Sequence, residues 1–272
     1  MPSKENLAIL GAGNIGKSIA DGLVNSGQYI ANQIILTRRK IHLLEDYKKR
    51  GFIITDTNIE AVQKANIIII AVEPQQIKNL LEEISPALDS MRHICISIVS
   101  DISIAAIIGL IGKTVPVVRA MPNTAIAIGE SMTCLSSNDG KALELSSSIF
   151  DALGKTLVID EEQMIPATAL GACGIAFFLR AIRAASQGGI EIGFHPEEAI
   201  HIAAQTARGA ASLLLKSPKH PEGEIDKVTT PRGCTIAGLN QMEHEGFSSA
   251  MIKGIVTSCE KASRLYRQND KN

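Results

Sequence analysis

A short apolar segment near the start of the chain runs directly into a glycine-rich turn. The segment covers residues 7–10, the turn reads Gly11-Ala12-Gly13-Asn14-Ile15-Gly16, and helical patterning follows. In a strand–turn–helix unit of this form, Gly11 allows the tight turn, Gly13 lets a pyrophosphate approach the backbone, and Gly16 lets the helix pack closely on the strand. The context predicts a dinucleotide site, and the alternative is a glycine-rich turn without a ligand.

The second apolar segment, residues 33–36, ends in three polar residues, Thr37, Arg38 and Arg39. A site for NAD usually has an acidic residue here, which holds the ribose hydroxyls. Two guanidinium groups instead suit the 2′-phosphate of NADPH, because they form charge-assisted hydrogen bonds with it. We therefore expect NADPH, with NADH as an alternative. The competing interpretation is that both arginines only begin a solvated helix at residues 40–50.

Apolar strands alternate with helical segments through the first half of the chain. Further strands are expected at residues 52–54, 66–72, 94–99 and 115–119, and a last strand pair at 132–135 and 157–159 flanks a helix at 139–153. The alternation predicts an α/β fold with a Rossmann-type, doubly wound parallel sheet. Ligands bind beyond the carboxyl ends of such strands, so the corner at Val72, Glu73 and Pro74 should border the cofactor. Thr57 and Glu60 predict a capping box for a short helix.

Helical patterning replaces strand patterning from about residue 164. We therefore divide the chain into a dinucleotide-binding domain at residues 1–162 and an all-helical substrate and dimerisation domain at residues 163–272. Residues 167–192 are small and apolar on almost every side, which predicts a helix buried on most of its faces. A small helical lobe can hardly cover such a helix, so we expect a homodimer or larger assembly through these helices. Arg180 and Arg183 interrupt the run and argue against a membrane span.

Composition excludes several classes of partner. The formal net charge is −1, no polybasic run is present and aromatic residues make up 3%, so nucleic acid is not an expected partner. The five cysteines are scattered without C-x-x-C spacing, and the six histidines have no ligand spacing, so no metal site is predicted. The absence of a secretory pattern and the scattered thiols favour a cytoplasmic protein.

Near the end of the chain, residues 228–239 read VTTPRGCTIAGL and lead into helical patterning. Backbone N–H groups at the start of a helix are unpaired and bind anions well. The threonine hydroxyls could add hydrogen bonds to a carboxylate or to a ring nitrogen. On local chemistry alone, the alternative is an ordinary helix cap, because Ser and Thr favour that position.

This run closely resembles the signature of the pyrroline-5-carboxylate reductase family. Shorter segments agree with the family: the glycine turn, Ala71-Val72 with Pro74-Gln75, and Met121-Pro122-Asn123-Thr124. The resemblance covers nearly the whole chain. It implies the reduction of 1-pyrroline-5-carboxylate to L-proline by hydride transfer from NAD(P)H, the last step of proline synthesis.

The resemblance also implies roles for individual residues. The substrate carboxylate would bind the backbone N–H groups around Gly233 and Cys234 and the hydroxyl of Thr230. Thr235 would be the catalytic residue, because its hydroxyl would bind near the ring nitrogen and orient the C=N carbon toward the nicotinamide. The residues expected at the cofactor are Gly11, Ala12, Gly13, Asn14, Ile15, Gly16, Thr37, Arg38, Arg39, Asn58, Ala71, Val72, Pro74, Met121, Pro122 and Asn123.

Two other functions stay open. A hydroxy-acid dehydrogenase of similar two-domain plan would carry a catalytic Lys or His in the first long helix of its second domain, and residues 164–192 contain neither. A non-enzymatic NADPH-binding protein of the same fold is the second alternative, because a fold does not determine a function. Glu73, Ile175 and Arg232 depart from the family pattern, which usually has lysine, proline and a small residue there.

Overall fold

The computed structural model describes residues 5–217 and 219–269. Their contacts divide the chain into two compact units, residues 1–173 with 258–272, and residues 174–257. The first unit contains the sheet and the second contains helices only. The division after residue 173 is a contact boundary, and the domain boundary expected after residue 162 stays a prediction.

The first unit is built on one sheet of eight strands in the order β3-β2-β1-β4-β5-β6-β7-β8. The strands are β1 (Leu7–Leu10), β2 (Ile34–Thr37), β3 (Ile53–Thr55), β4 (Ile67–Ile70), β5 (Ile94–Ser97), β6 (Val117–Met121), β7 (Ser131–Ser137) and β8 (Gly154–Val158). β1 pairs in parallel with both β2 and β4, and its four residues are fully buried. The reversal of strand order around β1 confirms the doubly wound fold.

One strand pair departs from the expected parallel sheet. β7 runs antiparallel to β6, whereas β7 and β8 are parallel. Between β6 and β7 the chain forms only a 3₁₀ helix, Thr124–Ile128, and not a crossover helix. A connection this short joins antiparallel strands more readily than parallel ones, because a parallel return needs a long crossover.

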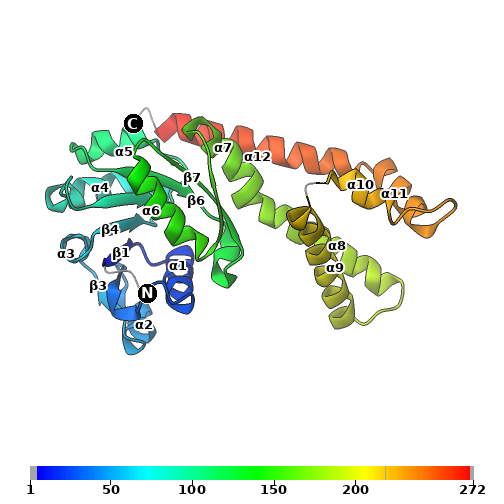
Figure 1. The fold of residues 1–272 in the computed structure, drawn as a ribbon, viewed down its shortest axis with the longest axis horizontal. Coiled ribbons are helices and arrows are strands. Elements are labelled where there is room, and N and C mark those ends of the chain that lie inside the picture. Colours follow the sequence, from blue (N-terminus) through cyan, green and yellow to red (C-terminus); the bar gives the residue numbers. More distant parts are fainter. Residues whose placement is uncertain (1–4, 218, 270–272) are drawn as a thin grey trace. The chain divides into compact units, whose positions relative to one another are not determined.

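Helices cover both faces of the sheet (Figure 1). The helices α1 (Asn14–Asn25), α2 (Glu45–Lys49) and α6 (Gly140–Asp151) contribute to one hydrophobic core, and α3 (Asn58–Lys64), α4 (Ile77–Ile84) and α5 (Ile104–Ile111) contribute to the other. Alternate residues of β1 and β4 belong to opposite cores, because successive side chains of a strand point to opposite faces.

One local expectation is confirmed in part and another is wrong. The segment expected to be one helix at residues 40–50 is helical, but it divides into a 3₁₀ helix, Ile41–Leu44, and the short α2. Thr57 precedes α3, but its side chain caps no backbone N–H, so the capping box does not form. The Glu60 carboxylate instead accepts a hydrogen bond from the Thr55 hydroxyl at 2.7 Å and pairs with Lys64. These charge-assisted contacts compete with the cap for the same carboxylate.

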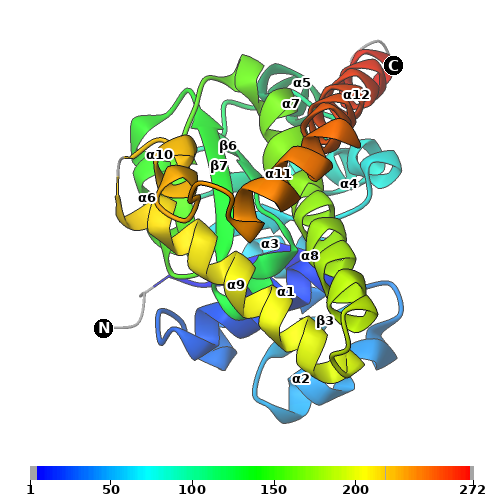
Figure 2. The same cartoon turned by 90° about the vertical axis from the view of Figure 1, so that its right-hand side faces the viewer.

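Helices make up the second unit. A continuous helical segment begins in the first unit with α7 (Met164–Ala167) and a π-helical turn, Thr168–Cys173, and continues in the second unit as α8 (Gly174–Glu191). The later helices are α9 (Pro196–Lys216), α10 (Pro221–Asp226), α11 (Cys234–His244) and α12 (Phe247–Asn269), the last of which ends in the first unit. α8 and α9 lie side by side (Figure 2). The helix expected at residues 167–192 is thereby confirmed.

The helices of the second unit expose many large apolar side chains. Examples are Phe178, Leu179, Ile202, Leu215 and Ile252. The helical segment Glu161–Glu191 is long and apolar enough to cross a membrane by length and composition alone, and 11% of its most apolar stretch is buried. The expectation that this segment does not span a membrane therefore stays a prediction.

A buried arginine joins several segments of the first unit. Arg119 on β6 is 1% exposed and its guanidinium donates to the Glu161 carboxylate at 3.2 Å and to the Ser100 carbonyl at 3.0 Å. The same Glu161 oxygen accepts the backbone N–H of Ile104, the first residue of α5, at 2.7 Å. The guanidinium carbon lies 5.4 Å from the centre of the Tyr266 ring. Arg119 thus connects the end of α12 to the sheet.

Candidate active site

The glycine turn fits closely against the end of β4. Gly11 has φ +94°, a left-handed conformation that side chains disfavour. A Cβ added to Gly11 would lie 2.7 Å from the Ala71 carbonyl oxygen, and one added to Gly16 would lie 2.9 Å from the Gly11 carbonyl oxygen. Both positions therefore require glycine for packing.

Gly13 differs from its two neighbours. A Cβ added there would find no atom closer than the Gly11 carbonyl oxygen at 4.0 Å, so the protein leaves open space at this residue. Gly13 is also the N-cap of α1, and no side chain caps the helix. The first N–H groups of α1 are therefore available to an anion, as the approach of a pyrophosphate requires.

Thr37 and Asn58 form a hydrogen-bonded chain behind the turn. The Thr37 hydroxyl accepts the backbone N–H of Gly11 at 3.2 Å and donates to the Asn58 side-chain oxygen at 2.7 Å. The Asn58 amide in turn donates to the Glu83 carboxylate at 3.1 Å. The end of β2, the start of α3 and the glycine turn are thus held together by side chains, which brings together residues that the sequence predicts at the cofactor.

The two arginines after β2 differ in their surroundings. Arg38 is half-buried, and its guanidinium donates to the carbonyl of Ala12 in the glycine turn at 3.2 Å. Arg39 is exposed. Because Arg38 uses one of its five N–H donors on the turn, it is fixed beside the dinucleotide site with further donors for a phosphate. The structure therefore favours Arg38 over Arg39 as the predicted phosphate ligand, and the role stays a prediction.

The remaining predicted cofactor residues lie at the ends of β4 and β6. Ala71 and Val72 are half-buried beside Gly11, and Pro74 opens a 3₁₀ helix, Pro74–Gln76, that leads into α4. Glu73 is exposed. The lysine that the family usually has there would also lie at the surface.

After β6, Met121 and Pro122 are buried. The side-chain oxygen of Asn123 accepts the backbone N–H of Ala125 at 3.0 Å, and its amide donates to the Gly171 carbonyl at 3.4 Å. Asn123 therefore caps its own loop, which is the local role expected of asparagine in a turn. A cofactor contact by this side chain stays a prediction.

The signature run forms a tight turn that opens directly into α11. The Gly233 N–H donates to the Thr230 carbonyl at 2.9 Å, and a Cβ on Gly233 would lie 2.5 Å from the Thr230 hydroxyl. Arg232 has φ +61°, and it is the only non-glycine residue in the described ranges with positive φ. Such a conformation is costly for arginine, which indicates that the turn is strongly determined.

No side chain caps α11, although its first turn carries hydroxyl and thiol groups. Gly233 is the N-cap, Cys234 is exposed and Thr235 is half-buried. The ordinary capping role considered for the threonines is therefore not what they do in this structure. The first N–H groups of α11 and the Thr235 hydroxyl remain available for the predicted substrate carboxylate and imine nitrogen.

Four titratable groups whose pKa values shift toward the neutral form, Tyr47, His93, Cys95 and Cys134, lie outside these segments. Burial, followed by its 2.6 Å hydrogen bond to Asp21, raises the pKa of Tyr47 to about 12. Burial raises the pKa of the Cys95 thiol to about 12, raises the pKa of Cys134 and lowers that of His93. These shifts prepare none of the four groups to carry a charge in catalysis. Within residues 5–217 and 219–269, no group of three His, Cys, Asp or Glu residues could hold a metal ion.

Two residues of this framework are not apparent from the sequence. Glu83 follows another glutamate on the polar face of α4, and the pattern does not distinguish the carboxylate that reaches Asn58. Arg119 lies inside a buried apolar strand, where its charge only suggests an unknown partner. Both contacts join segments far apart in the chain, so no local spacing could reveal them.

Comparison with known proteins agrees with both units. Residues 161–265 match a family model described as pyrroline-5-carboxylate reductase dimerisation, and residues 6–101 match one described as NADP oxidoreductase, coenzyme F420-dependent. The chain is 51% identical to pyrroline-5-carboxylate reductase 2 of Dictyostelium discoideum over 282 residues, which cover 97% of this chain and 94% of the relative. The chain belongs to the pyrroline-5-carboxylate reductase family.

Two further likenesses extend this result. The chain is 56% identical over 280 residues to pyrroline-5-carboxylate reductase 1 of Dictyostelium discoideum, which covers 98% of this chain but about half, 51%, of that relative. A crystal structure of Plasmodium falciparum pyrroline carboxylate reductase with NADP bound shares the fold, with a TM-score of 0.89, 24% identity and coverage of 98% and 100% of the two chains. The expected fold and the class of NAD(P)H-dependent oxidoreductase are confirmed for the family.

The three glycines of the turn give a paired prediction. Gly11→Ala should lower the free energy of unfolding by about 2 kcal/mol or more, because it combines positive φ with a backbone clash. Gly13→Ala should leave stability within about 0.5 kcal/mol of the wild type and weaken NADPH binding about tenfold or more, because its methyl group enters the space left for the pyrophosphate. Urea unfolding and titration of NADPH fluorescence measure the two quantities. Equal NADPH affinity of Gly13→Ala and the wild type would contradict the site.

Proposed function

We propose that this chain reduces 1-pyrroline-5-carboxylate to L-proline with NAD(P)H, as the names of its relatives state for them. The observation that carries the proposal is the start of α11, where the family signature forms a tight turn without a side-chain cap. The unpaired N–H groups at the start of an uncapped helix bind a carboxylate, and the hydroxyl of Thr235, the second residue of α11, can bind a ring nitrogen. A small anionic cyclic imine has both groups.

The chemistry requires little acid–base help from the protein. When bound, the cofactor supplies a hydride to the carbon of the C=N bond, and the electron pair of that bond goes to the nitrogen, so that the protonated imine becomes a secondary amine. We propose that the N–H groups of Gly233 and Cys234 and the Thr230 hydroxyl hold the carboxylate, while the Thr235 hydroxyl holds the nitrogen. The protein contributes orientation and exclusion of water.

We propose NADPH as the preferred cofactor. Support comes from Arg38, which the glycine turn fixes beside the dinucleotide site, and from the absence of an acidic residue at the end of β2. The family model that matches residues 6–101 also names NADP. A guanidinium held in place recognises a 2′-phosphate better than a mobile one, because less conformational entropy is lost on binding.

The helices of the second unit are proposed to form a homodimer interface. The exposed apolar residues of α8, α9 and α12 support this, as does the match of residues 161–265 to a dimerisation model. A monomer rarely exposes apolar surface over several neighbouring helices. A cytoplasmic location is proposed from the five cysteines, all of which are free.

Thr235→Ala gives the direct test of the catalytic assignment. We expect turnover with pyrroline-5-carboxylate to fall about tenfold to a hundredfold, because a hydrogen bond to the reacting group is lost, while the affinity for NADPH stays within twofold. Turnover is measured as the steady-state loss of absorbance at about 340 nm, a wavelength at which the reduced nicotinamide of NADPH absorbs. Thr206→Ala, an exposed hydroxyl on α9, should change neither quantity. Unchanged turnover of Thr235→Ala, or equal loss of turnover and NADPH affinity, counts against the assignment.

The same assay separates the alternative functions. A hydroxy-acid dehydrogenase would oxidise NADPH when a keto acid is added, and not when pyrroline-5-carboxylate is added. NADPH binding without turnover of either substrate would favour a non-enzymatic protein.

Cofactor choice is tested by comparing the two arginines. Arg38→Ala should raise the KM for NADPH about tenfold or more and change the KM for NADH less than threefold, because only NADPH carries the 2′-phosphate. Arg39→Ala, the neighbouring exposed arginine, should have the smaller effect on NADPH. A larger loss in Arg39→Ala than in Arg38→Ala would transfer the phosphate contact to Arg39.

The interface is tested by placing a charge on α8. Phe178→Asp should shift the protein from dimer to monomer at micromolar concentration, because a carboxylate buried in an apolar interface costs several kcal/mol. Light scattering after size exclusion measures the mass. Met91→Asp, at an apolar residue of the first unit that is 93% exposed, should leave the mass unchanged. A dimer of unchanged stability in Phe178→Asp would place the interface elsewhere.

A further inference from the structure

A directional chain of hydrogen bonds links α4 to the glycine turn. Glu83, in the last turn of α4, accepts from the side-chain amide of Asn58 at 3.1 and 3.3 Å with its two carboxylate oxygens. The Asn58 oxygen accepts from the Thr37 hydroxyl at 2.7 Å, and that hydroxyl accepts the backbone N–H of Gly11 at 3.2 Å. Glu83 is exposed and Thr37 is 2% exposed, so the chain runs from the surface to the buried end of β2.

The carboxylate of Glu83 determines which way the Asn58 amide points. An ionised carboxylate accepts hydrogen bonds and donates none, so the group that faces Glu83 is the amide NH₂, and the group that faces Thr37 is the amide oxygen. The single hydroxyl hydrogen of Thr37 is then used on Asn58, which leaves its oxygen to accept from Gly11. If the amide were reversed, its oxygen would meet the carboxylate, and two acceptors without a hydrogen between them repel each other.

The orientation matters because the end of β2 is where a Rossmann fold reads the adenosine ribose. Thr37 lies there beside Arg38, the predicted ligand of the 2′-phosphate. A phosphate oxygen only accepts hydrogen bonds and needs donors around it, whereas a free ribose hydroxyl both donates and accepts. The Asn58 NH₂ has two hydrogens, so it keeps one for a phosphate when the other binds Glu83. NADPH therefore depends on the orientation of this amide more than NADH does.

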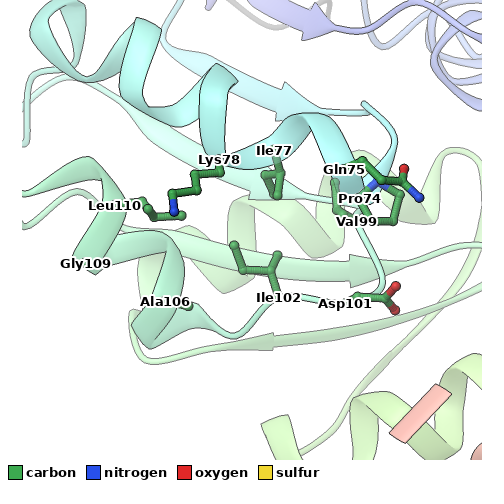
Figure 3. Close-up of a pocket in the computed structure, with 10 residues that line it drawn as sticks. All are labelled: Pro74, Gln75, Ile77, Lys78, Val99, Asp101, Ile102, Ala106, Gly109 and Leu110. Carbon is green, nitrogen blue, oxygen red and sulfur yellow. The ribbon is translucent and has the colours of Figure 1, made fainter. Parts of the chain in front are cut away.

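The contact with Asn58 is separate from the cavity beside α4. That cavity has a volume of about 390 Å³, and the first turn of α4 contributes Ile77 and Lys78 to its lining (Figure 3). Glu83 is not among the residues that line it. A molecule in this cavity would therefore not contact the Glu83 carboxylate.

We propose that Glu83 is a positioning residue for cofactor choice, because it holds the Asn58 amide so that a donor faces the 2′-phosphate of NADPH. The inference rests on the NADPH site proposed above and not on the reaction with the imine. Without Glu83, only the Thr37 hydroxyl holds the amide, and a hydroxyl also accepts from a reversed amide. The charge of Glu83 acts in the opposite direction, because a carboxylate repels a phosphate. Orientation and charge thus predict opposite changes in NADPH affinity.

The affinities of the full chain for NADPH and NADH, measured by titration of cofactor fluorescence, test this role. Glu83→Ala should raise the Kd for NADPH about threefold to tenfold and leave the Kd for NADH within about twofold, which also shows that the variant is folded. Glu83→Gln should keep both values within about twofold of the wild type, because its side-chain oxygen still accepts from Asn58. Glu82→Ala removes the neighbouring exposed carboxylate of the same helix and should change neither value.

A double-mutant cycle tests whether Glu83 acts through Asn58. Asn58→Ala alone should raise the Kd for NADPH, and the addition of Glu83→Ala should have no further effect, because no amide is left to orient. A further loss in the double variant would overturn the proposal. So would an unchanged or lower Kd for NADPH in Glu83→Ala, an equal loss of NADPH and NADH, or an equal loss in Glu83→Gln or Glu82→Ala.

The same titrations distinguish the role of Glu83 from the NADPH site itself. A wild type that binds NADPH, with Glu83→Ala of equal affinity, refutes only the role of Glu83. A wild type that binds no NADPH refutes both the site and the role.

Discussion

The contact between the glycine turn and the end of β4 is the constraint on which the dinucleotide site depends. Gly11 lies so close to the carbonyl of Ala71 that no side chain can be placed there, and its positive φ turns the chain from β1 into α1. The same residue donates its N–H to Thr37, which in turn binds Asn58. One close backbone approach therefore determines where β1, β2, β4 and the start of α1 meet, and the open space at Gly13 follows from it.

Much of this arrangement could be predicted from the sequence because its causes are local. A run of four isoleucines at Ile67–Ile70 predicts a strand buried on both faces, and the spacing of Gly11, Gly13 and Gly16 predicts the turn. The antiparallel pairing of β7 and the failure of the Thr57–Glu60 capping box could not be predicted. The antiparallel pairing depends on the connection between β6 and β7, which is too short for a crossover helix. The capping box fails because the Thr55 hydroxyl competes for the Glu60 carboxylate.

The signature run shows the same division between local and distant causes. Its resemblance to one enzyme family could be recognised from the amino-acid sequence alone, and the chain belongs to that family. The sequence does not reveal that α11 lacks a side-chain cap or that Arg232 adopts positive φ. Arg232 departs from the family pattern, which usually has a small residue there. The turn still forms, although positive φ is an unfavourable conformation for the backbone of an arginine.

The most direct measurement for the central claim is a crystal structure of the protein with NADPH and L-proline. The account predicts the pyrophosphate beside Gly13 at the start of α1, the 2′-phosphate on Arg38, and the proline carboxylate on the N–H groups of Gly233 and Cys234, with its ring nitrogen within hydrogen-bond distance of Thr235. A cofactor bound away from the glycine turn, or a proline bound away from the start of α11, would contradict it.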